Sequence, residues 1–305
     1  MQPWPIAVVL AIAAAAPAAQ KRERAPRTAY VTLDAVVLDD RSGHPVRGLQ
    51  GGDFEVKEDG KAVTIDHASE VALLGLADER VGRSIVLLLD DTLRGASSNT
   101  VVQGLSRMFL SQARPDDAVG VVRLTHESDD AVGSLEQAAE RVNQYRARAL
   151  PFFGIESIED LLNTVTRVSK AVASNPPRRT AAVCIGQRVL CDPYFPNPEY
   201  SLASRQWHSA LVESARANVA VYFVDPAGVT GAGPDMGYGL VDHTGGVAFT
   251  MSNSFVRAVD SIWEQAGHYY LLGYTPTSDR RDEHSIEVKV KRSDMTVHAR
   301  LARGD

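Results

Sequence analysis

Hydrophobic and polar positions follow three different patterns along the chain, and each pattern occupies one stretch. In residues 29–70, apolar and polar side chains alternate over short runs such as 54–57, and Asp59-Gly60 separates two of these runs. An Asp-Gly pair between alternating segments is typical of a β-hairpin. Because apolar residues do not recur at helical spacing here, we predict that this stretch is all β.

The middle stretch, residues 82–266, combines buried strands with helices. Continuous apolar runs cover 84–89, 118–124, 180–185 and 219–224. Such runs are typical of strands that are covered on both faces of a parallel sheet. Between and after them, apolar residues recur at helical spacing in 101–109, 135–142, 158–168 and 255–266. Strands that alternate with helices predict an α/β domain with a mainly parallel, doubly wound sheet.

The last stretch, residues 267–305, returns to strand patterns. Residues 286–291 and 297–301 alternate strictly, which places one face of each strand in water. The simplest arrangement pairs these strands with those of residues 29–70, so that the α/β domain is inserted into one small β-sandwich. The predicted units are a signal peptide (1–18), a flexible N-terminus (19–28), the first part of the sandwich (29–81), the α/β domain (82–266) and the second part of the sandwich (267–305).

The N-terminus determines the expected compartment. Residues 6–16 are all Ala, Val, Leu or Ile, and Ala16-Pro17-Ala18 places small residues where a signal peptidase cuts. No Lys or Arg precedes the apolar run, so an uncleaved membrane anchor is the alternative, although the run is short for a membrane span. We expect an exported protein, periplasmic or secreted, without a membrane span after cleavage.

Export makes the two cysteines, Cys184 and Cys191, relevant. In an oxidising compartment, cysteines at this separation can form a disulfide that closes a loop. The alternative is that Cys184 is a buried strand residue and Cys191 is a loop thiol. The sequence does not choose between them, because the distance between the two Cα atoms decides.

Composition excludes one class of partner. The 305 residues carry a formal net charge of −6, and 44% of them are hydrophobic. These values are ordinary for a soluble globular protein. Binding to nucleic acid needs a basic face, so the acidic balance argues against a nucleic-acid partner.

Four separated segments resemble, in the same order, the von Willebrand factor A-related family described from acidobacteria. They are GLQGGDFEVKEDGK (48–61), HTGGVAF (243–249), GHYYLLGYTP (267–276) and IEVKVKR (286–292). The resemblance covers nearly the whole mature chain. It implies a von Willebrand A fold, which is Rossmann-like, and an exported protein. The biochemical function of the family is itself poorly defined.

Many von Willebrand A domains bind a divalent cation through a metal-ion-dependent adhesion site. Its pattern is D-x-S-x-S after the first strand, Thr on a second loop and Asp on a third, and these hard oxygen ligands suit Mg²⁺. In this chain Asp90 matches the first Asp, Thr92 replaces the first Ser, and Arg94 stands at the second Ser. Glu156 occupies the Thr position, and the third loop reads Cys184-Ile185-Gly186 where the pattern has Ser-Asp-Gly, so its Asp is missing.

This degenerate pattern favours a site without metal. The guanidinium of Arg94 has no acceptor for a cation, and the ligand count is short. We expect Arg94 to pair with Asp90, Asp91 or Glu156 instead, and we expect no cofactor. The alternative is a working Mg²⁺ site, in which Asp90 and Thr92 would be ligands.

No catalytic pattern stands out. The chain lacks a G-x-S-x-G motif, and its His residues lack metal-ligand spacing. We therefore expect a non-catalytic module that binds a protein partner through the loops after its strands. The candidate residues of these loops are Asp91, Phe153, Tyr194, Phe195 and Tyr238. The alternatives are a periplasmic enzyme and a structural component of the cell envelope. The sequence does not indicate the identity of the partner or the oligomeric state.

Overall fold

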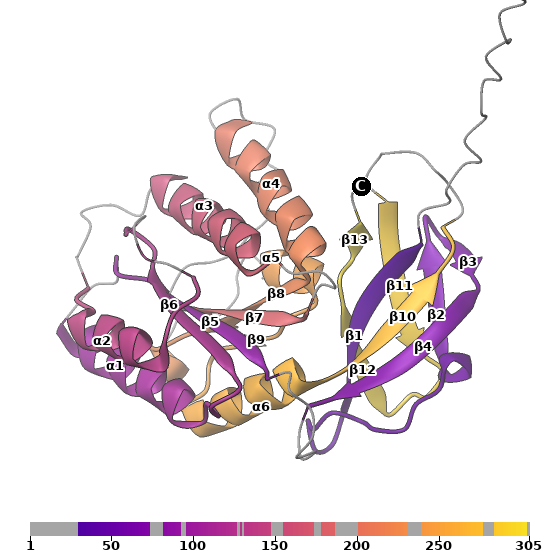
Figure 1. Ribbon diagram of the computed structural model, residues 1–305, viewed down its shortest axis with the longest axis horizontal. Coiled ribbons are helices and arrows are strands. Elements are labelled where there is room, and N and C mark those ends of the chain that lie inside the picture. The colour runs from indigo at the N-terminus through magenta and orange to yellow at the C-terminus, as the bar shows by residue number, and fades with distance from the viewer. Residues whose placement is uncertain are drawn as a thin grey trace, which may run out of the picture.

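Figure 1 shows the computed structural model of the chain. It describes residues 30–73, 82–92, 96–126, 129, 131–147, 155–173, 178–186, 201–230, 239–276 and 284–303, with the backbone alone at 96–98, 155–157, 201 and 302–303. The signal peptide and the flexible N-terminus that we predict lie outside these residues.

Five parallel strands form the central sheet, in the order β6-β5-β7-β8-β9. They are β5 (Ser84–Leu89), β6 (Ala118–Arg123), β7 (Thr180–Ile185), β8 (Val219–Val224) and β9 (Ala248–Phe249). Every residue of β5, β7 and β8 is buried. The continuous apolar runs of the sequence therefore mark strands that are covered on both faces, as predicted.

Helices cover both faces of this sheet (Figure 1). One face packs against α1 (Ala96–Ser111), α2 (Leu135–Gln144) and α6 (Phe255–Gly267). The other packs against α3 (Ile155–Val172), α4 (Ser201–Ala217) and α5 (Gly239–Thr244). Successive residues of β5 point to opposite cores, with Leu87 in the first and Leu88 in the second. The fold is α/β, with helices flanking a parallel sheet.

The strand order reverses beside β5. From β5 the chain continues to β6 on one side, and it then crosses back to β7, β8 and β9 on the other. The connections that leave β5 and β7 therefore diverge at the carboxyl edge of the sheet. In open α/β sheets, the crevice at such a reversal is the usual place for a ligand.

Two antiparallel sheets form a β-sandwich beside the α/β unit, with strand orders β12-β1-β10-β4 and β13-β11-β2-β3. The strands from the start of the chain are β1 (Val31–Asp39), β2 (Phe54–Glu58), β3 (Lys61–Val63) and β4 (Ile65–Ala72). Those from its end are β10 (His268–Tyr274), β11 (His284–Val290), β12 (Met295–Ala299) and β13 (Ala302–Arg303). Both sheets contribute side chains to one core, and both combine strands from the two ends of the chain.

A buried polar cluster joins the sandwich to the α/β unit. Asp34 of β1 is 3% exposed and forms ion pairs with Arg179 and Arg300. Arg179, which directly precedes β7, also donates hydrogen bonds to the hydroxyl of Tyr222 over 2.9 Å and to the carbonyl of Gly245 over 2.8 Å. A strand of the sandwich is thus tied to two strands of the parallel sheet and to the end of α5.

Some elements differ from the sequence prediction. We predict a helix that begins after a capping Ser157, but α3 begins at Ile155, so Ser157 lies within the helix. The sequence pattern also gives no prediction of α4, whose buried face consists largely of small side chains such as Ala203 and Ala210. Within the described residues, no helix combines the length and the apolar character that a membrane crossing requires.

Candidate functional site

The carboxyl edge of the parallel sheet collects polar side chains from three loops. The loop after β5 contributes Asp90, Asp91 and Thr92, the loop after β6 contributes Thr125 and His126, and Gly186 follows β7. Asp90 and Asp91 are fully buried, and Thr92 is 2% exposed. The structure therefore brings Asp90, Thr92 and Gly186 together at the strand reversal.

Thr92 closes a turn around the carboxylate of Asp90. The backbone N–H of Thr92 donates to Asp90 Oδ1 over 3.0 Å, and its hydroxyl donates to the same oxygen over 2.5 Å. Tyr145, at the end of α2, donates its hydroxyl to the backbone carbonyl of Asp90 over 2.7 Å. The side chain and the main chain of Asp90 are thus fixed by separate donors.

Tyr145 is suited to remain a donor at this place. Burial raises the pKa of its hydroxyl, and the neighbouring carboxylates of Asp90 and Asp91 raise this pKa further. The phenol therefore stays protonated at any physiological pH, and its hydrogen bond to the Asp90 loop does not depend on pH.

Asp91 points toward the loop after β6. Its Oδ1 accepts a hydrogen bond from the backbone N–H of Thr125 over 3.1 Å, and its Oδ2 accepts one from the Thr125 hydroxyl over 2.5 Å. His126 Nδ1 lies 3.1 Å from the same Oδ2. When Nδ1 carries the proton, Nε2 of this imidazole is an acceptor. The His126 side chain is 26% exposed, so it is accessible at the edge of the site.

A second ion pair fixes the loop that carries His126. Asp129 accepts from Arg123 Nε and Nη2, each over 2.8 Å, and its backbone carbonyl accepts from Arg167 of α3 over 2.6 Å. Burial by itself raises the pKa of Asp129, but the hydrogen bonds and charge of Arg123 outweigh this effect and hold the pKa below its usual value. The loop after β6 is therefore tied to both β6 and α3.

Gly186 allows the loops after β5 and β7 to touch. A Cβ added at this residue would lie 2.7 Å from Asp90 Cβ and 3.0 Å from Asp90 Oδ2. Such separations are shorter than van der Waals contact, so even a methyl group requires a shift here. The close approach of Asp90 therefore requires glycine at position 186.

The described side chains do not fit a divalent cation. Only the Asp90 carboxylate and the Thr92 hydroxyl converge, Asp91 is directed to Thr125, and Gly186 has no side chain. No group of three or more His, Cys, Asp or Glu side chains with metal-binding geometry occurs among the described residues. Mg²⁺ takes about six oxygen ligands, and the described side chains supply two of them, only one a carboxylate. The side chains of Arg94 and Glu156 lie outside the described residues, so their predicted pairing stays a prediction.

Several other sequence candidates also lie outside the described residues. They are Phe153, Cys191, Tyr194, Phe195 and Tyr238. Cys184 is buried in β7, within the core that faces α3 and α4. A disulfide between Cys184 and Cys191 therefore stays a prediction.

The structure adds residues that the sequence analysis missed. His126 and Tyr145 join the site because loops and a helix end bring them to it, which no spacing in the sequence reveals. Val229, Met251 and Val256 are more than half exposed, and they follow β8 and β9 at the same edge of the sheet. The sequence alone could have identified these three residues. Each is a large apolar residue that lies outside the apolar stripes of the predicted helices, or on the polar side of such a helix.

No protein-family model matches this chain, and no curated protein sequence matches it. The fold class comes from the structure, which shows an α/β unit with a five-stranded parallel sheet beside two antiparallel sheets.

Proposed function

We propose that this chain is an exported, non-catalytic protein of the von Willebrand A type, and that the carboxyl edge of its parallel sheet binds a protein partner without a bridging cation. The family part of the proposal is supported by the four sequence segments and by the strand reversal beside β5. The export part rests on residues 1–18, and it predicts that the mature protein begins at Ala19. N-terminal sequencing of protein recovered outside the cytoplasm tests it.

The binding mechanism rests on one observation, the hydrogen bonds that the two buried carboxylates accept from neighbouring residues. Asp90 accepts hydrogen bonds from Thr92, and Asp91 accepts them from Thr125 and has His126 beside it. In this proposal these bonds hold the loops in place, and no metal ion is needed. A partner would therefore meet a preorganised protein surface, and preorganisation reduces the entropy that binding costs.

Exposed apolar side chains at this edge of the sheet are available to contact a protein partner. Val229 is 54% exposed, Met251 52% and Val256 59%. The backbone N–H of Val229 donates to Asn253 Oδ1 over 3.1 Å, so the loops after β8 and β9 are held together. Large apolar residues, Met among them, are favoured at the centre of protein interfaces. We propose that Val229 and Met251 are the main contacts.

The backbone at Met251 supports a role in binding. Its φ is +51°, a left-handed conformation that is unfavourable for a residue with a long side chain. Strain of this kind costs about 1–3 kcal/mol and is concentrated at functional sites. It presents the Met251 side chain to solvent rather than to the core.

Site-specific photo-crosslinking in the producing cells tests the proposal. A photoreactive amino acid replaces Val229 or Met251, and in the control it replaces Leu135, which is 46% exposed. Leu135 starts α2, next to Gly133, which forms a bridge to Val119 near the amino end of β6. It therefore lies toward the opposite edge of the sheet, although its exposure is similar.

We expect one protein adduct of defined mass from positions 229 and 251, none from position 135, and no change when EDTA is present. An adduct from all three positions would mean that contact is unspecific. An adduct that disappears with EDTA and returns with Mg²⁺ would replace our mechanism by a metal-bridged one.

A further inference from the structure

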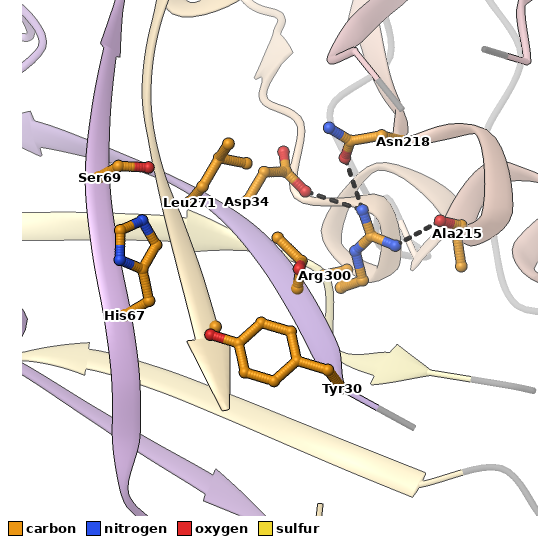
Figure 2. A pocket seen from close by; sticks show the side chains of 10 residues that line it. Tyr30, Asp34, His67, Ser69, Ala215, Asn218, Leu271 and Arg300 are labelled. Carbon is orange, nitrogen blue, oxygen red and sulfur yellow. Dashed lines mark hydrogen bonds and ion pairs between the residues drawn. The ribbon is translucent and has the colours of Figure 1, made fainter. Parts of the chain in front are cut away.

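A second candidate site lies away from the carboxyl edge, where the sandwich meets the end of α4. A cavity of about 310 Å³ opens there (Figure 2). Polar groups from both units line it, namely Tyr30, Thr32, Asp34, His67, Ser69, Asn218 and Arg300. This volume is at the lower end of the range of small-molecule sites, about 300–1,000 Å³. The cavity is thus large enough for a ligand of about one ring.

The charges around this cavity do not balance. Asp34 forms ion pairs with both Arg179 and Arg300, and among the described residues it is the one carboxylate that either guanidinium contacts. Arg179 is 1% exposed, and the side chain of Arg300 is 11% exposed. Two cations and one anion therefore leave an excess positive charge in a poorly hydrated place. Such a charge is costly unless an anion neutralises it.

Beside Asp34, Arg300 is the charged group that lines the cavity. Its Nη2 donates to Asp34 Oδ1 over 2.8 Å and to Asn218 Oδ1 over 2.6 Å, and its Nη1 donates to the carbonyl of Ala215 over 2.6 Å (Figure 2). These bonds fix the plane of the guanidinium, which has five N–H donors in all. Within the described structure, the Nε–H and one Nη1–H make no hydrogen bond. Burial lowers the pKa of Arg300 to about 10, and Arg179 adds to this effect, so an anion in the cavity would relieve the repulsion.

The remaining walls offer hydroxyl groups and an aromatic surface. Thr32 and Ser69 contribute hydroxyls, and His67 contributes a ring nitrogen. Tyr30 is 54% exposed and lies over Gly273, where an added Cβ would be 2.0 Å from the Tyr30 hydroxyl. Gly273 thus makes room for the phenol, which forms one side of the opening (Figure 2). Hydroxyls beside an aromatic ring suit a hydroxylated ring as ligand, because each ligand hydroxyl both donates and accepts.

We propose that this cavity binds a small hydroxylated organic acid, of the size of a uronic acid, with its carboxylate on Arg300. The excess positive charge favours a ligand with a carboxylate, and the hydroxyl groups of the cavity wall favour a ligand with several hydroxyls. The volume limits the ligand to one ring. The proposal does not depend on the partner-binding function of the carboxyl edge, because the two sites share no residue.

Calorimetric titration of the whole mature protein tests the proposal, with glucuronate, glucose, benzoate and inorganic phosphate as probes. We expect saturable binding of glucuronate, and binding of glucose and of benzoate that is weaker by about tenfold or more, since one charge-assisted hydrogen bond contributes at least about that factor. Equal binding of glucose would overturn the assignment of an anion. Binding of phosphate alone, or of no probe, would overturn the hydroxylated acid.

Variants locate the site. Ser69→Leu fills the cavity from β4 without removing any hydrogen bond that the described structure shows, so it should fold normally and lose glucuronate binding by about tenfold or more. Thr64→Leu, at an exposed position just before β4, is the matched control and should bind like the unmodified protein. Unchanged binding in Ser69→Leu would place the ligand elsewhere and end the proposal.

Discussion

The absence of a side chain at position 186 determines the geometry of the carboxyl edge. Because a Cβ there would come within 2.7 Å of Asp90 Cβ, the loops after β5 and β7 can touch only with glycine at this position. One small residue therefore keeps these two loops in contact.

A charged side chain at position 186 should consequently destabilise the protein. Gly186→Asp adds both a steric overlap and a negative charge next to buried Asp90, and overpacking alone costs about 1–3 kcal/mol. We expect the free energy of unfolding in urea to fall by about 3 kcal/mol or more. Gly104→Ala is the control, because Gly104 lies within α1 and nothing lies within 4 Å of an added Cβ. It should stabilise the protein by about 0.5–1 kcal/mol. A Gly186→Asp variant of normal stability would show that the loops move apart easily.

His298 gives a prediction about pH. Burial, together with the positive charge of Arg179, lowers the pKa of this β12 imidazole to about 4, against 6.5 for an ordinary His. The unfolded chain therefore binds a proton more readily than the folded protein. The stability due to neutral His298 is complete above about pH 6.5 and is lost as the pH falls toward 4. Between pH 7 and pH 5 we expect a loss of about 2 kcal/mol from this group.

Urea unfolding of the unmodified protein and of His298→Gln at both pH values separates this effect from that of the other histidines. His44, for example, has a pKa that is raised by its hydrogen bond to Glu264, so it stabilises the fold in acid. If His298→Gln shows the same change between pH 7 and pH 5 as the unmodified protein, His298 is not the source of the pH dependence.

At the scale of the elements, hydrogen bonds of Asp91 with Thr125, and the His126 ring beside Asp91, hold the loops after β5 and β6 together. A ligand raises the melting temperature only when it binds the folded state in preference to the unfolded one. We therefore expect that millimolar Mg²⁺ or Ca²⁺ leaves the melting temperature of the purified protein unchanged, and that EDTA does so too. A saturable rise with either cation, followed by differential scanning calorimetry, would show a working metal site.

The sequence predicts elements well where burial alone determines the pattern. β5, β7 and β8 are recognised because burial on both faces requires an unbroken apolar run. α4 is missed because alanines make up much of its buried face, and a small apolar residue gives a weak signal of helical spacing. The sequence also misplaces the start of α3, because a Ser-x-x-Asp pattern occurs inside helices as well as at their ends.

For the candidate site, the sequence locates Asp90, Thr92 and Gly186 through their places after strands, and the structure brings them together. It does not locate Tyr145 or His126. Tyr145 reaches the Asp90 carbonyl across 55 positions of the chain, and only the packing of α2 on the sheet creates that contact. Contacts of this kind depend on tertiary geometry, which no local pattern encodes.

In the whole molecule, the two ends of the chain complete one sandwich around the α/β unit. β1 pairs with β10 and β12, and β2 pairs with β11, so the first strands find most of their hydrogen-bonding partners beyond residue 267. α6 ends at Gly267 and β10 begins at His268, which couples the last helix of the α/β unit directly to a central strand of the sandwich. The ion pairs of Asp34 with Arg179 and Arg300 also connect the sandwich to the α/β unit.

This interleaving predicts how fragments of the chain behave. Residues 29–81 alone should be unfolded, because β1 loses both of its neighbours in the sheet and so short a segment buries too little apolar surface. The complementary fragment, residues 82–305, contains β10–β13 and therefore presents the missing partners. Mixing the two fragments should produce a complex with a cooperative thermal transition, observed by circular dichroism and by size-exclusion chromatography. The control is a 29–81 fragment with Val37→Asp, which places a charge in the sandwich core and should prevent association. A 29–81 fragment that melts cooperatively by itself would show that the first strands form an independent domain, and the shared sandwich would then be wrong as a folding unit.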